Sequence, residues 1–337
     1  MTTVTYKNDL GWDPRSMLRA PMTWPKVLWL TGAVLLVTMV FHIFALVVTG
    51  GSVSGPVSLR KPATFAETGW LNAWAVALML PTLHTRAWQR HVIGFAVVAF
   101  GVVETTVMAI QAWRGVPSHY NFTTTFDAVL MRAGAAGTAG VFLIGMVVLL
   151  VVALRDTESP VSVRLGVRAG IVVLLVGCLV GFAMISNMSG VYQGSFGSGF
   201  TEPAVGYLGP SASTVGPEYL LLRPATRGGD LILPHAIGVH GLVLIAVPAL
   251  LLARTSMAAA HQRRVIMTIV ASVTVAMGLL LLHALRQLPL DQLSPVSLAV
   301  LAACGLGLLV SYVMTASALV RERRARSGAG RRAGIRR

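Results

Sequence analysis

The sequence predicts an all-α fold, a polytopic transmembrane bundle of about eight helices in two parallel four-helix halves related by a pseudo-two-fold axis. Composition is the first reason: 55% of residues are hydrophobic, only 12% are charged and the mean hydropathy is +0.73, whereas soluble domains carry about 25% charged residues. Apolar runs of about 20 residues, enough to cross a hydrocarbon core of about 30 Å, are the second. Similar stretches recurring half a chain apart are the third.

The apolar runs define the predicted spans in chain order. They fall at 25–49, 64–83, 92–113, 128–154, 166–186, 234–253, 265–285 and 296–320. The chain then divides into an N-terminal segment 1–24, a first half 25–155, a second half 156–320 and a basic tail 321–337. Residues 189–233, rich in Gly, Ser and Pro, form the one long predicted loop. A loop of this length is typical either of a functional lid or of a loosely ordered segment.

Two pairs of motifs support an internal repeat. Gln-Ala-Trp-Arg-Gly-Val-Pro at 111–117 resembles His-Ala-Leu-Arg-Gln-Leu-Pro at 283–289, at a separation of 172 residues. Gln-Arg-His-Val-Ile at 89–93 resembles Gln-Arg-Arg-Val-Ile at 262–266, at a separation of 173. The two separations therefore differ by one residue. Because four crossings return the chain to its starting side, duplication of a four-helix unit predicts two halves of the same orientation.

Basic residues set the predicted orientation. Twenty of the 27 Lys and Arg residues share one side if both termini lie there, and such residues are retained on the cytoplasmic side. We therefore expect a multi-pass protein of the cell membrane with both termini cytoplasmic. Its expected partners are the lipid bilayer and anionic lipids at the cytoplasmic face. The basic tail does not predict nucleic-acid binding because no soluble domain accompanies it, and nothing identifies a protein partner.

Buried ionisable residues indicate a site in the outer half of the membrane, since such groups are costly in lipid. Glu104, Met108 and Gln111 share one stripe of the third predicted helix, and a carboxylate on that stripe is expected to face the bundle interior. His240 aligns with Thr68 of the first half. The candidate catalytic residues are Glu104, Gln111 and His240.

Further polar residues gather in the same outer layer as candidates for binding an anionic substrate or haem propionates. They are Arg60, Lys61, Arg114, His119, Asn121 and Asp127. Two of them have structural alternatives. Arg114, at a helix end, is also consistent with snorkelling to headgroups, and Asp127 is also consistent with capping the fourth helix and pairing with Arg114 or Arg132.

Four histidines are candidate ligands for haem iron or a metal ion, because neutral imidazoles in a dry pocket bind such ions well. They are His42, His235, His240 and His283. The five-residue spacing of His235 and His240 separates them by about 140° on a regular helix, so both would enter one small metal site only if the helix were distorted there.

Three segments resemble a group of uncharacterised bacterial multi-pass integral membrane proteins with no assigned activity: Ser54–Pro62, Gln111–Asn121 with Phe126-Asp127, and Pro234–His240. The resemblance implies membrane topology only. The plan is also similar to that of haem A synthase, with eight helices in two parallel halves and histidines toward the outer face. The Glu-x-x-His-Arg signature of that family would be sought at Glu67, where the His-Arg pair is missing.

Three functions remain open at this point. The first is a membrane-embedded enzyme or redox protein that binds haem or a metal ion through two of His42, His240 and His283, with Glu104 as acid or base. The second is a transporter of a small solute that uses Glu104 as an intramembrane carboxylate. The third is a non-catalytic module that binds a lipid or a partner protein through the long outer loop.

Overall fold

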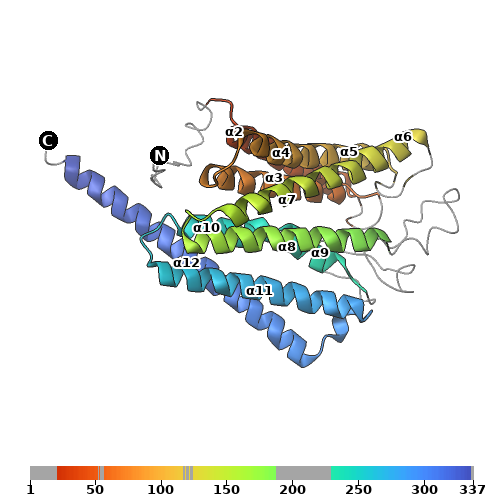
Figure 1. Cartoon of the computed structure of the whole chain (residues 1–337). Helices are drawn as coiled ribbons and strands as arrows, with labels where there is room; N and C mark the ends of the chain where they lie inside the picture. Colours follow the sequence, from red (N-terminus) through yellow and green to blue (C-terminus); the bar gives the residue numbers. More distant parts are fainter. Residues whose placement is uncertain are drawn as a thin grey trace.

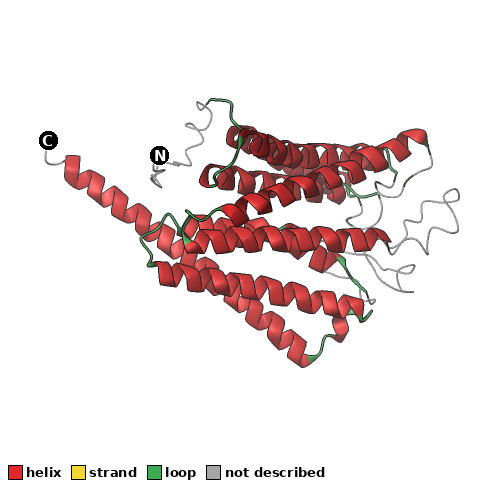
Figure 2. Ribbon diagram, in the orientation of Figure 1, coloured by secondary structure: helices red, strands yellow, loops and turns green. Residues whose placement is uncertain are grey.

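The computed structural model describes residues 21–51, 53, 57–116, 118, 121, 124–186 and 229–334, without the side chains of 185–186 and 326–334. All regular secondary structure in these ranges is helical (Figure 2). The candidate His119, residues 1–20 and nearly all of the predicted loop 189–233 lie outside the described residues.

The helices follow the predicted order, with bounds that shift by a few residues. The main elements are α2 (Trp24–Thr49), α3 (Arg60–Met79), α4 (Ala87–Ala99), η2 (Phe100–Glu104), α5 (Thr105–Trp113), α6 (Thr125–Val129), η3 (Leu130–Ala136), α7 (Gly137–Arg155), α8 (Val161–Ser186), α9 (Ile232–Val239), η6 (Leu242–Ala246), α10 (Val247–Leu252), α11 (Ala259–Leu285) and α12 (Pro295–Gly334). Two 3₁₀ turns, η1 (Leu80–Thr82) and η7 (Leu290–Gln292), complete the set. The last helix continues well past the predicted end at residue 320, into the basic tail.

Six of the described helices are long and apolar enough to span a membrane, and the bent pair formed by α9 and η6–α10 makes a seventh. The protein is therefore a multi-pass membrane protein. The second predicted span does form a helix, α3, but this helix is not among the six because it carries Glu67, Asn72 and two threonines besides its basic start. The count of eight crossings and the pseudo-two-fold relation of the halves stay predictions.

Local sequence explains where the helices start and stop. Pro25 lies in the first turn of α2, where its missing N–H costs nothing, and Gly50 ends that helix with a φ of 63°, a conformation that glycine adopts without strain. The backbone N–H of Arg86 donates to the side chain of Gln89 at 2.8 Å and so caps α4.

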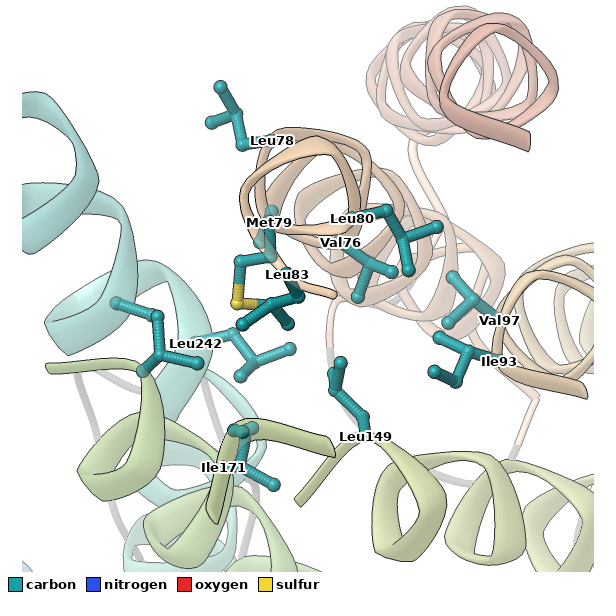
Figure 3. Packing of buried hydrophobic residues seen from close by; sticks show 14 of the residues in the cluster. Val76, Leu78, Met79, Leu80, Leu83, Ile93, Val97, Leu149, Ile171 and Leu242 are labelled. Carbon is teal, nitrogen blue, oxygen red and sulfur yellow. The ribbon is translucent and has the colours of Figure 1, made fainter. Parts of the chain in front are cut away.

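The core lies around α3, most of whose residues are buried. Val76 and Met79 of α3 lie near Leu149 of α7, Ile171 of α8 and Leu242 of η6 (Figure 3). These residues come from both predicted halves, so one apolar core joins them. In Figure 1, α2 and α4 lie along one side of the bundle, α11 and α12 lie along the other, and α7 and α8 lie between.

Three π-helical turns interrupt the spans. η2 separates α4 from α5, η3 separates α6 from α7, and η6 separates α9 from α10. The span containing η6 is also bent by 48° near His240 and Gly241. Turns of this kind are rare and occur frequently at functional sites.

Candidate functional site

Asp127 lies at the centre of a closed polar cluster at one end of the bundle. Its Oδ1 accepts hydrogen bonds from Gln111 Nε2 at 2.8 Å and Arg114 Nη1 at 2.5 Å, and its Oδ2 accepts one from Thr124 Oγ1 at 2.6 Å. Arg114 Nη1 also donates to Gln111 Oε1. We call the set Gln111, Arg114, Thr124 and Asp127 the Asp127 clasp.

The geometry of the clasp favours a structural role. Asp127 is 1% exposed, and its side chain accepts from three partners, as a buried carboxylate requires. Thr124 caps α6 by accepting from the backbone N–H of Asp127 at 3.1 Å. The Arg114 guanidinium lies 4.9 Å from the centre of the Phe126 ring. The clasp therefore ties the end of α5 to the start of α6. Both the amide nitrogen and the amide oxygen of Gln111 are engaged within it.

Glu104 occupies a different environment, although it shares a stripe with Gln111. It is 4% exposed and ends the π-helical turn η2. Met108, fully buried, lies between Glu104 and Gln111 along the helix, and seven residues of α-helix separate the two by about 10 Å. The two predicted catalytic groups thus face the interior but belong to separate polar clusters.

One oxygen of Glu104 has a partner and the other does not. Oε1 lies 3.3 Å from Thr138 Oγ1, and Oε2 is buried without a hydrogen-bond partner among the described residues. Thr138 Oγ1 also lies 2.5 Å from the carbonyl oxygen of Gly134 in η3. A hydroxyl has a single hydrogen, which the shorter contact to Gly134 takes. Thr138 can then accept from Glu104 only when the carboxyl carries a proton.

A separate polar contact, between Asn72 and Val239, joins the two predicted halves. Asn72 of α3, 1% exposed, donates from Nδ2 to the carbonyl oxygen of Val239 at 3.3 Å, next to the bend at His240. Asn72 Oδ1 and His240 Nδ1 are both buried without a hydrogen-bond partner in the described part of the chain. Two buried polar atoms without a hydrogen bond therefore lie near the bend between α9 and η6, where this span contacts α3.

His42 is buried, but both of its ring nitrogens are occupied. Nδ1 lies 2.8 Å from the carbonyl oxygen of Thr38, and Nε2 lies 3.3 Å from the indole nitrogen of Trp113. A carbonyl only accepts and an indole N–H only donates, so Nδ1 carries the hydrogen and Nε2 accepts. No lone pair remains for iron. The helices that carry His42 and His283, α2 and α11, lie on opposite sides of the bundle (Figure 1).

His235 and His283, the two remaining candidate metal ligands, form hydrogen bonds to backbone carbonyl oxygens. His235 Nδ1 lies 2.8 Å from the oxygen of Gly177, and His283 Nε2 lies 2.7 Å from the oxygen of Pro289. Each retains one nitrogen that could bind a metal ion. Within the described ranges, however, no group of three or more His, Cys, Asp or Glu side chains is arranged to hold a metal ion.

The remaining candidate substrate-binding residues are Arg60, Lys61 and Asn121, and none of them lines the groove that the structure identifies between α8 and α11. Arg60 and Lys61 begin α3, and Asn121 is 4% exposed just before α6. α3 packs against α5. The described contacts do not join the predicted residues of the outer layer into a single site.

Sequence reasoning missed several partners of these groups. Thr138 follows a run of small residues and Asn72 lies in an apolar stretch. A lone amide in the middle of a span was a usable signal for Asn72, because unsatisfied polar groups are costly there. Nothing in the sequence pointed to Trp113 as the partner of His42.

Comparison with protein-family models, with curated proteins and with solved structures found no match for this chain. The likeness to uncharacterised bacterial membrane proteins and to haem A synthase stays a prediction.

Proposed function

We propose that the protein transports a small solute across the membrane and that Glu104 exchanges a proton, or a cation, during the cycle. The observation that carries this proposal is the buried Glu104 Oε2, which has no hydrogen-bond partner in the described residues. An intramembrane carboxylate without a cationic partner is costly and marks proton relays and ion pathways. Its free oxygen is available to a proton or to a cation.

The two π-helical turns beside Glu104 support a site that changes during function. η2 carries Glu104 itself, and η3, which contributes the Gly134 carbonyl, packs against η2. A π-helical turn weakens the regular ladder of helical hydrogen bonds locally, and such turns are frequent at functional sites. Both helices could therefore change their local geometry while the rest of each span stays intact.

The bent span supports transport rather than catalysis. It breaks beside Val239, where Asn72 of the other predicted half makes contact. Many transporters bind their substrate at the interface between two halves, next to broken helices. His240 and Asn72 each keep one unsatisfied buried atom there, so polar groups remain available to a solute that reaches this contact.

The enzyme or redox function now has less support among the described residues. His42 has no free nitrogen, and the clasp uses the amide of Gln111. A haem or metal site would have to rest on His235, His240 or His283. The third function depends on the predicted loop 189–233, nearly all of which lies outside the described residues.

Proteoliposomes with a trapped pH-sensitive dye test the proposal. Gradients of Na⁺, K⁺, Mg²⁺, amino acids or sugars are imposed one at a time, and the internal pH is followed. We expect at least one solute to change the internal pH with the wild type, Glu104→Gln to abolish the change, and Glu67→Gln, a matched helical carboxylate, to preserve it. Equal pH changes with Glu104→Gln, or none with any solute for the wild type, would overturn the proposal.

A further inference from the structure

A groove runs between α8 and α11. Its volume is about 630 Å³. Val172 and Val176 of α8 and Met277 and Gly278 of α11 are among the residues that line it. None of the candidate site residues lines the groove, so it is a separate feature of the molecule.

One end of the groove is strongly basic. Arg164 and Arg168 line it within the first two turns of α8. Arg168 donates to the carbonyl oxygens of Ala153, Leu154 and Asp156, and Arg164 Nη1 donates to the carbonyl oxygen of Thr157. These acceptors are neutral. In the described ranges neither guanidinium forms an ion pair with a carboxylate, so two positive charges stay unneutralised at the mouth.

The rest of the groove is apolar apart from Thr274 of α11, and beyond the arginines it is about as long as one leaflet is deep. From Arg164 its lining on α8 runs on to Val176, and 12 residues of α-helix extend about 18 Å. One leaflet of a bilayer core is about 15 Å deep, so an acyl chain that enters beside the arginines fits within the groove. Gly278 widens the groove, because a Cβ added there would meet no atom within 4 Å.

We propose that this groove holds one anionic phospholipid, with its phosphate against Arg164 and Arg168 and one acyl chain between α8 and α11. The basic end of α8 lies on the side that the positive charges predict to be cytoplasmic, where anionic headgroups attract basic residues. Nη1 of Arg168, and Nε and Nη2 of Arg164, make no hydrogen bond in the described residues, so these N–H groups can donate to a phosphate. The proposal does not depend on transport.

Spin-labelled lipids in reconstituted membranes test the headgroup contact. The wild type is placed in phosphatidylcholine vesicles that contain spin-labelled phosphatidylglycerol or spin-labelled phosphatidylcholine, and the motion-restricted lipid is measured. We expect one phosphatidylglycerol per chain to be restricted with a clear preference over phosphatidylcholine. Arg164→Gln with Arg168→Gln should weaken that association about 30-fold. Arg263→Gln with Arg264→Gln, which removes two exposed arginines of α11, should leave it unchanged.

A second pair of variants tests the chain-binding part and does not disturb Arg168, whose hydrogen bonds also hold the end of α7. Gly278→Phe fills the groove and should abolish the selective association, whereas Gly305→Phe, where an added Cβ is equally free, should preserve it. Equal retention of both lipids by the wild type would mean that only ordinary surrounding lipid is present. That result, or selective binding that survives Gly278→Phe, would overturn the proposal.

Discussion

Removal of the Asp127 carboxylate should destabilise the bundle substantially. In Asp127→Ala, Arg114 and Gln111 lose their shared acceptor and Thr124 loses a partner. Breaking a buried ion pair by removing one partner costs about 3–5 kcal/mol. The Arg114 side chain is 38% exposed, so water partly replaces its lost partner, and we expect a loss of about 2–3 kcal/mol. Asp127→Asn keeps the shape and one acceptor, and should lose about 1–2 kcal/mol.

Equilibrium unfolding in mixed detergent micelles, followed by helical circular dichroism, measures these losses. Asp291→Asn, which alters an exposed carboxyl of η7, serves as the control and should change stability by no more than about 0.5 kcal/mol. A double-mutant cycle with Arg114→Ala isolates the pair and should give a coupling energy of at least about 1 kcal/mol. A coupling energy near zero, or an unchanged stability of Asp127→Ala, would show that the clasp does not hold α5 to α6.

Two further predictions concern the packing of the second half and its contact with the first. Gly177→Ala should destabilise the protein by about 1–3 kcal/mol, because the added Cβ would lie 2.6 Å from the backbone of Gly238; Gly140→Ala, with open space at its Cβ, should be neutral in the same unfolding assay. Asn72→Leu removes the hydrogen bond to Val239 and should slow solute-driven pH change in proteoliposomes more than it lowers the melting temperature. Parallel losses of rate and stability would instead assign Asn72 a purely structural role.

Helix order and side-chain burial were predictable from the sequence because both follow from apolar periodicity. Glu104 and Gln111 were expected to face the bundle interior, and both are buried. Asp127, His42 and His283 were expected only in the outer layer, and they are buried as well. Hydrophobicity alone places such groups away from lipid, whatever their partners are.

The partners of these buried groups were not predictable, because they depend on how each helix is rotated and shifted against its neighbours. Gln111 binds Asp127 rather than Glu104, because Glu104 lies about two helical turns away. The break near His240 had a partial signal in the flanking Gly238 and Gly241, yet glycines are common in membrane helices. Neither the bend nor its contact with α3 follows from them.

If the two similar blocks descend from a duplication, the π-helical turn η2 accounts for the one-residue difference between their spacings. From Gln89 to Gln111 the chain advances 22 residues, and from Gln262 to His283 it advances 21. All four side chains are buried, so the longer helix keeps the same inward faces. A π-helical turn accommodates an additional residue because its hydrogen bonds reach from i to i+5. η2 lies between Gln89 and Gln111, whereas α11 is an uninterrupted α-helix.

If the two halves descend from one duplicated unit, Glu104 stands where a single inserted residue entered one copy. Such an insertion would widen one turn without rotating the helix beyond it and would leave a carboxyl there, whereas α11 is an uninterrupted α-helix. The polar centre of the first half would then be a late local addition to an older apolar scaffold. A variant with one residue deleted within 100–104 should recover that scaffold, with Gln89 and Gln111 still facing inward.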